Sequence, residues 1–233
     1  MTGRIFAGVA LAAMLLTAGP AAAEQLLWGV KAEQLEYRRG GDSNLLAWDV
    51  NAHVGTDELK LVYRSEGEFK RKGSVLERFE NHFRAQVPIS TFFDAVGGVR
   101  IDTPEGPDRV HGLIGLHGLA PQWFEVDADF FVSDHPSFRL EVEYEALITN
   151  RLILTPSLEF DLPFKDDTAI DIGAWGPKAE IGLRLGYDLI DRLVSPYVGV
   201  HYERVFGKTR DLARAEGKDD DAFYLTVGMK MIF

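Results

Sequence analysis

The last eleven residues, 223–233, alternate strictly between apolar and polar positions until Ile232. The odd positions are all apolar: Phe223, Leu225, Val227, Met229, Met231 and Phe233. Successive side chains of a strand point to opposite faces, so this segment predicts a β-strand with one apolar and one polar face. Such a strand suits a membrane β-barrel or the edge of a soluble sandwich, and the terminal aromatic residue favours the barrel.

The same two-residue period recurs through the chain, whereas no stretch sustains a helical period. The clearest example is 138–148, where apolar residues alternate with Arg139, Glu141, Glu143 and Glu145. Most segments are close to the length that crosses a bilayer at a tilt. Twelve strands are predicted, at Leu27–Arg38, Asn44–Val54, Glu58–Ser65, Ser74–Val87, Phe92–Ile101, Arg109–Gly118, Trp123–Val132, Phe138–Ile148, Leu152–Leu162, Lys178–Leu189, Pro196–Phe206 and Ala222–Phe233.

The lengths of the links test this prediction independently, because membrane barrels have long outer loops and short periplasmic turns. The odd-numbered links are mostly long: Arg39–Ser43, Glu66–Gly73, Asp102–Asp108, Ser133–Ser137, Pro163–Pro177 and Gly207–Asp221. The even-numbered links are mostly short: Gly55–Asp57, Pro88–Thr91, Leu119–Gln122, Thr149–Asn150 and Ile190–Ser195. A soluble sandwich has no reason to alternate in this way. We therefore predict an all-β, antiparallel, up-and-down transmembrane barrel of twelve strands with both termini in the periplasm.

The first 23 residues have the features of a secretory signal peptide rather than of the fold. Arg4 is followed by the apolar run Ile5–Leu16, and Ala21–Ala23 forms a small-residue cleavage site before Glu24. No later stretch approaches the length of a transmembrane helix. We expect residues 1–23 to be cleaved and residues 24–233 to form the barrel, exported to the outer membrane of a Gram-negative cell.

Charge and composition narrow the function. The formal charge is −11, and loss of Arg4 would change it to −12, which argues against nucleic acid as a partner and suits a surface that attracts cations. The chain has no cysteine, which excludes disulfides and thiolate sites.

Several segments resemble one known family. They are Glu33–Arg38 (EQLEYR), Ser65–Glu68 (SEGE), Gly118–Ala128 (GLAPQWFEVDA), Glu141–Glu145 (EVEYE), Thr149–Pro156 (TNRLILTP) and Glu203–Gly217 (ERVFGKTRDLARAEG). In this order they are similar to the copper-resistance protein B family over essentially all of residues 24–233. The resemblance implies an outer-membrane barrel in copper homeostasis or resistance, with copper ions as its ligand and a periplasmic multicopper oxidase as a partner.

The sequence departs from the family in one respect. Many members carry a Met- and His-rich segment ahead of the barrel, whereas here the first predicted strand begins almost directly after Ala23. Beyond that residue, methionine occurs only at Met229 and Met231, both on the predicted lipid face. Thioether ligands, which favour Cu(I), are therefore not expected in the lumen, and imidazole and carboxylate ligands, which suit Cu(II), remain.

The candidate metal ligands follow from which positions point inward. His82, His111, His117 and His201 have inward parity, Glu125 and Asp127 lie across a short turn from His117, and Glu203 lies on the same face as His201. We predict metal ligation by His117, Glu125, Asp127, His201 and Glu203, in one cluster or in two weak sites. The first three are expected near the periplasmic mouth, and His201 and Glu203 further outward.

The alternative is that these charges pair with one another, since barrel interiors are polar. Arginines with inward parity are Arg64, Arg78, Arg84, Arg100, Arg139 and Arg184. Ion pairing is expected for Glu141, Glu143, Glu145, Glu159, Asp161 and Glu180. The acids of Ser65–Glu68 are assigned to an outer loop, where they are either solvated or collect cations.

Two other functions are alternatives to copper handling. Some twelve-stranded barrels are lipases, but only Ser133 and Ser137 flank a histidine, His135, and no Gly-x-Ser-x-Gly elbow occurs, so no enzyme is predicted. The other is a scaffold that recruits a periplasmic oxidase through its short turns and needs no pore.

Overall fold

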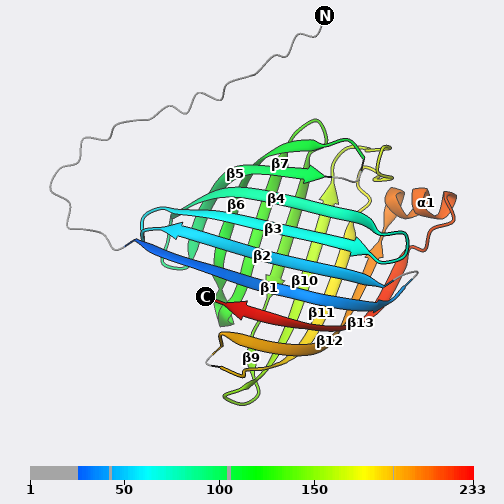
Figure 1. Cartoon of the computed structure of the whole chain (residues 1–233). Coiled ribbons are helices and arrows are strands. Elements are labelled where there is room, and N and C mark those ends of the chain that lie inside the picture. Colours follow the sequence, from blue (N-terminus) through cyan, green and yellow to red (C-terminus); the bar gives the residue numbers. More distant parts are fainter. Residues whose placement is uncertain (1–25, 42–43, 104–105, 191) are drawn as a thin grey trace, which may run out of the picture.

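The computed structural model describes residues 26–41, 44–103, 106–190 and 192–233, and the predicted signal peptide lies outside them. The strands pair antiparallel in chain order, and the sheet closes on itself through the pairs β1–β13 and β10–β11 (Figure 1). The strands are β1 (Leu27–Gly40), β2 (Leu45–Gly55), β3 (Lys60–Lys70), β4 (Val75–Pro88), β5 (Phe93–Thr103), β6 (Arg109–Ala120), β7 (Phe124–Val132), β8 (Ser137–Glu143), β9 (Ala146–Leu147), β10 (Leu152–Pro163), β11 (Lys178–Tyr187), β12 (Val194–Val205) and β13 (Asp221–Ile232). Because β8 and β9 are two parts of one interrupted strand, this is the predicted twelve-stranded barrel.

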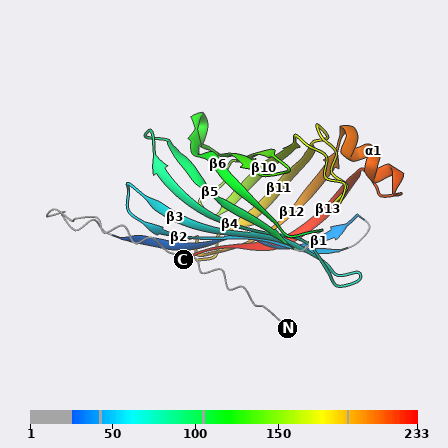
Figure 2. The same ribbon diagram turned by 90° about the horizontal axis from the view of Figure 1, so that it is seen from above.

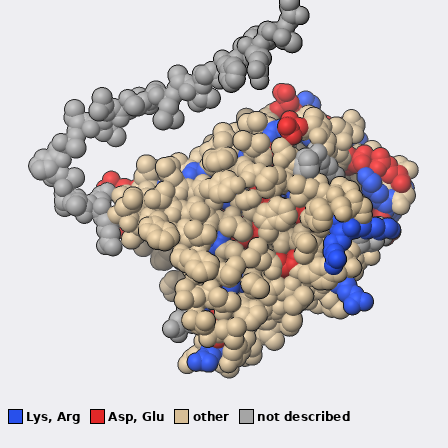
Figure 3. Space-filling model, in the orientation of Figure 1, with Lys and Arg blue, Asp and Glu red and all other residues tan. Residues whose placement is uncertain are grey.

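The terminal strand has the predicted two faces. Phe223 and Leu225 are more than half exposed on the outside, while Tyr224 and Thr226 are about 95% buried inside. The outer face turned to the viewer in Figure 3 is mostly uncharged, and charged side chains gather toward the end that carries the helix α1 (Gly207–Ala215). Among the described residues, no helix combines the length and apolar character that crossing a bilayer requires.

Both ends of the described chain lie at the same end of the barrel. The Val30 amide donates to the Phe233 carbonyl (3.0 Å), and the Phe233 amide donates to Val30 (2.8 Å). Figure 2 shows α1 beyond the ends of β12 and β13, away from the C-terminus. We call these two ends the terminal mouth and the helix mouth.

The assignment of Ser65–Glu68 to an outer loop is wrong. The third strand runs to Lys70, and the pairs Asp49↔Glu66 and Glu66↔Glu80 place Glu66 within the sheet. Its carboxylate is buried and forms salt bridges with arginines inside the barrel. Glu66 therefore belongs to the lumen wall and does not collect cations from solvent.

The eighth strand is interrupted where a single segment, 138–148, was predicted. The Tyr144 amide donates to the Pro156 carbonyl on β10 (3.1 Å), but proline has no N–H to return the second bond. The ladder therefore stops at Glu143 and resumes at Ala146. Phe124 still packs against Tyr144, with ring centroids 5.0 Å apart, across the gap.

The link Gly207–Asp221, expected to be a loop, contains α1. The Thr209 hydroxyl donates to the Gly176 carbonyl (2.6 Å), which fixes the helix against the long link before β11. On the surface, a hydrogen bond from the Lys208 ammonium to Asp166 lowers the pKa of that carboxyl. The helix and the 164–177 link together form a packed structure over the helix mouth.

Ion pairs fill the interior, as the inward arginines predicted. The Arg64 guanidinium reaches from β3 to Glu141 on β8 (2.6 Å), and Arg139 on β8 reaches back to Glu80 on β4 (2.9 Å). These strands are not neighbours, so the pairs cross the lumen. The predicted ion pairing of Glu141, Glu143, Glu145, Glu159, Asp161 and Glu180 is confirmed.

One part of the lumen is apolar, which the alternation did not predict. Phe131 is fully buried and forms a cluster with Val96 and Leu113. The Arg100 guanidinium lies over the Phe131 ring, 3.8 Å from its centroid, where a cation–π contact is favourable. Side chains from β5, β6 and β7 therefore fill the lumen on one side of the helix mouth.

Replacing Arg139 should destabilise the barrel strongly. Arg139→Ala removes the guanidinium that contacts Glu80 and Asp161 at 2.8–3.1 Å. Glu80 keeps Arg78, whereas Asp161 loses its salt bridge, and breaking a buried pair in this way costs up to about 3–5 kcal/mol. Denaturant unfolding in detergent or lipid should show this loss. Arg210→Ala, which removes an exposed pair with Asp211, is the control and should have little effect. Equal effects of the two variants would contradict this account of the interior.

Restoring the missing N–H should join β8 to β9. In Pro156→Ala the new amide can donate to the Tyr144 carbonyl and complete the reciprocal pair. Hydrogen exchange should then show protection at position 156 and stronger protection at Ala146. Unchanged exchange at Ala146 would mean that another residue interrupts the strand.

Candidate metal centre in the barrel lumen

A cavity of about 370 Å³ occupies the middle of the lumen. Four predicted ligands, His117, Glu125, Asp127 and His201, line it. A second cavity, of about 220 Å³, adjoins it toward the terminal mouth and shares Glu125 with it. The described lumen therefore offers space next to most of the predicted ligands.

His117 and Asp127 form a pair near the terminal mouth. They are register partners on β6 and β7, and His117 Nδ1 lies 2.9 Å from Asp127 Oδ2. A carboxylate on Nδ1 orients the ring and leaves Nε2 for a metal, as is common for metal-ligating histidines. The other Asp127 oxygen accepts from Arg84 at 2.7 Å. This pair can supply one imidazole ligand with a fixed orientation.

Glu180, His201 and Glu203 form a second group, whose ligand atoms lie within 4.8 Å of one another. Glu180 comes from β11, whereas the other two lie on β12, and His201 Nε2 is 3.1 Å from Glu180. The Lys178 ammonium lies 2.8 Å from each of the two carboxylates. Lysine thus occupies the place between them that a bound cation would take.

The hydrogen bonding of His201 leaves one ring nitrogen unused. Nε2 lies 3.2 Å from Arg38 Nη1, which can only donate, and 3.1 Å from Glu180, which can only accept when ionised. A single tautomer satisfies one of these contacts. Nδ1 is buried without a partner in the described structure, so the imidazole retains unused capacity for a ligand or a proton.

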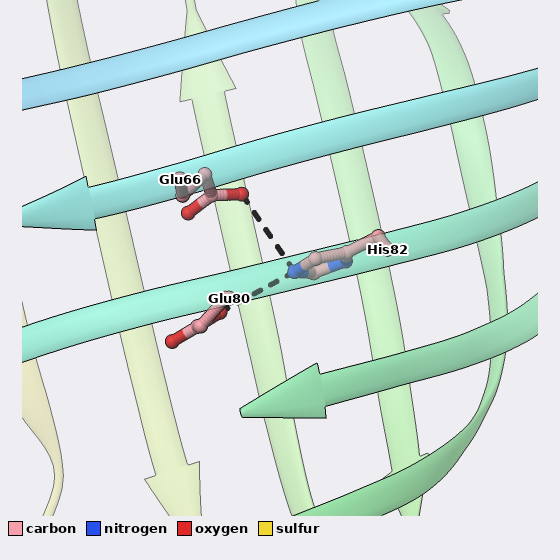
Figure 4. Close-up of side chains that lie close together, drawn as sticks. All are labelled: Glu66, Glu80 and His82. Carbon is pink, nitrogen blue, oxygen red and sulfur yellow. Dashed lines mark hydrogen bonds and ion pairs between the residues drawn. The ribbon is translucent and has the colours of Figure 1, made fainter. Parts of the chain in front are cut away.

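Sequence reasoning missed a third group, Glu66, Glu80 and His82, shown in Figure 4. His82 Nε2 lies 3.3 Å from Glu80 and 3.8 Å from Glu66. The sequence predicts the inward parity of His82, but assigning Glu66 to a loop separates the two residues. The surrounding guanidinium groups belong to Arg64, Arg78, Arg100 and Arg139. So many cations disfavour a metal ion there, and we interpret the group as part of the ion-pair network.

The structure separates the five predicted ligands into two groups. His117 with Asp127, and His201 with Glu203, do not belong to one set of ligand atoms within 4.8 Å in the described lumen. Glu125 lies two residues from Asp127, opposite Glu143, and is not part of such a set either. Glu180, assigned only to ion pairing, completes the second group. Metal ligation by these residues stays a prediction.

The serine and histidine considered for catalysis are arranged as a turn. The Ser133 hydroxyl accepts the backbone N–H of His135 at 3.0 Å, and the His135 ring lies 3.9 Å from Asp167. The hydroxyl therefore has a local structural role. The absence of enzymatic activity stays a prediction.

Comparison with solved structures supports the fold. The chain superposes on the NanC porin with a TM-score of 0.55 and 11% identity, covering 88% of this chain and 99% of that one. The KdgM porin matches with a TM-score of 0.48 and 11% identity, over 87% of this chain and 98% of the porin. At this identity the likeness to NanC concerns the fold alone, which is that of an outer-membrane barrel.

Sequence comparison is more specific. The profile described as copper resistance protein B precursor matches residues 26–233. Copper resistance protein B of Escherichia coli is 36% identical over 203 residues, which cover 86% of this chain and 68% of the relative. Its homolog in Pseudomonas syringae pv. tomato is 35% identical, over 87% of this chain and 68% of the relative. The chain therefore belongs to the copper resistance protein B family of outer-membrane barrels, and this membership supports a role in copper resistance.

Proposed function

We propose that the barrel binds copper ions inside its lumen and passes them across the outer membrane. The observation that carries this proposal is the gathering of imidazole and carboxylate groups around an internal cavity. Nitrogen and oxygen donors of this kind suit Cu(II). The outward position of Met229 agrees with a lumen that does not rely on thioether ligands.

The two groups have different parts in this proposal. Near the terminal mouth, His117 offers Nε2, Asp127 holds the ring, and Glu125 adds a carboxylate two residues away. Toward the helix mouth, His201, Glu180 and Glu203 can take a cation once Lys178 moves away. Displacing an ammonium costs energy, so we expect weaker binding at the second group.

The orientation and processing of the chain form part of the same proposal. A signal peptide at residues 1–23 would export the chain, and two termini at one mouth fit insertion with that mouth in the periplasm. Lipid would then surround the apolar outer face. The terminal mouth would face the periplasmic multicopper oxidase that the family resemblance implies.

Calorimetry tests copper binding. Protein purified in detergent should bind Cu(II) more tightly than about 1 mM, and His117→Ala/His201→Ala should weaken the affinity about tenfold or more. His135→Ala, which removes an imidazole from a link outside the lumen, is the control and should bind as the wild type does. Binding weaker than millimolar that the double substitution leaves unchanged would remove the site assignment.

A measurement of copper flux distinguishes a barrel that conducts copper from one that only recruits an oxidase. Liposomes that contain the folded barrel and a fluorophore quenched by copper should lose fluorescence faster on addition of Cu(II) than liposomes with heat-unfolded protein. The negative lumen should favour cations, so chloride should pass more slowly than copper. Equal quenching in both preparations would favour a barrel that recruits an oxidase without conducting ions.

A further inference from the structure

Five carboxylates lie side by side across five neighbouring strands of the lumen wall. Each is the register partner of the next, so neighbouring Cα atoms are about 5 Å apart. We call this set the carboxylate row. Its members are Asp127 on β7, Glu141 on β8, Glu159 on β10, Glu180 on β11 and Glu203 on β12.

The row crosses the barrel from one mouth toward the other. At its first end, Asp127 pairs with His117, three residues before the end of β6 at the terminal mouth. At its last end, Glu203 lies two residues before the end of β12 at the helix mouth. A register row in a tilted barrel climbs along the axis in this way. The two groups of candidate ligands are therefore the two ends of one row.

Adjacent like charges in a sheet destabilise it unless cations offset them. Cationic side chains supply that charge here. Arg64 reaches Glu141 from across the lumen, Arg78 and Arg139 contact Glu159, and Lys178 contacts the last two members. Most of these cations are shared with acids outside the row; Arg139, for example, also binds Glu80. The carboxylates therefore keep a surplus of negative charge that a mobile cation can offset.

The remaining space in the lumen follows the row. Phe131, with Val96 and Leu113, fills only the part of the β5–β7 side that lies toward the helix mouth. The central cavity is lined by His117 and by every member of the row except Glu203. A small cation in this cavity is thus within reach of successive carboxylates.

We propose that the carboxylate row is the path by which Cu(II) crosses the lumen. The ion passes between neighbouring carboxylates, and at each step it displaces the arginine or lysine that holds the carboxylate, which returns when the ion has left. Conduction through closely spaced sites needs such weak binding at each one. This path rests on the proposed conduction of copper and names the residues that carry it.

Two substitutions on β10 separate the path from general charge in the lumen. Glu159→Gln removes the central member of the row. Asp161→Asn neutralises a lumen acid two residues away that also contacts Arg139. Asp161 lies outside the row, because its register partners are Lys178 and Arg139. Copper flux into liposomes should fall about tenfold in Glu159→Gln and stay near the wild-type rate in Asp161→Asn. Calorimetry on the same preparations should show affinity at His117 and His201 unchanged within about twofold.

Glu141→Gln provides a second break in the row. Circular dichroism, together with heat-modified migration in electrophoresis, verifies that each variant is folded. Loss of flux in both row variants, with normal flux in Asp161→Asn, supports the path. Equal flux in all variants, or an equal loss in Asp161→Asn, overturns it while the proposed conduction stands. If the wild type binds copper but conducts none, conduction fails and the path fails with it; if the wild type does not bind copper, the binding proposal fails separately.

Discussion

The pairing of carboxylates with guanidinium groups across the lumen is the interaction on which the rest of this barrel depends. Closing the sheet puts Glu141, Glu159 and Glu180 side by side in the register, an arrangement that like charges oppose. Arg64, from across the lumen, and Arg139, on the same strand as Glu141, offset that repulsion. The same contacts hold distant parts of the chain together, so the charge pattern and the closure of the barrel stabilise each other.

This network also limits the free space inside the lumen. Cross-lumen pairs and the Phe131 cluster occupy much of the interior, so the lumen holds two adjoining cavities of about 370 and 220 Å³ rather than a wide aqueous channel. A cation entering it meets carboxylates that already have partners, such as Glu180 and Glu203 with Lys178. On the proposed path, exchange with these partners would keep each site weak, so that an ion could leave as readily as it enters.

Alternation along the chain predicted the strands and the direction of each side chain, because both follow from a period of two. It failed where a neighbouring strand determines the outcome. Phe131 has the same inward parity as Asp129, but only the pairing of the neighbouring strands brings Val96 and Leu113 against it. The break after Glu143 depends on Pro156, a residue of the next strand, whose missing N–H is apparent only once the two are paired.

The candidate site shows the same limit. The inward parity of His117 and His201 follows from the sequence, but their connection through the carboxylate row depends on how strands pair over separations of 14–23 residues, which no local pattern contains. The sequence misplaced Glu66 because the outward positions beside it, Ser65 and Gly67, are not apolar and so interrupt the alternation. The pairing of the strands, more than the type of residue, places these acids in one row.

The ligand atoms of the lumen, imidazole nitrogens and carboxylate oxygens, bear on which metal ion would bind there most tightly. Imidazole and carboxylate groups bind divalent first-row metals generally, and among these Cu(II) binds most tightly at a given set of ligands. On the proposed path, selection for copper would need no dedicated cage, since His117 at one end and His201 at the other add nitrogen donors to a row of carboxylate oxygens. Calcium and magnesium prefer oxygen ligands alone and gain nothing from the imidazoles. On the proposed path, the imidazoles would discriminate between ions at the two ends, and the carboxylates between them would carry the ion.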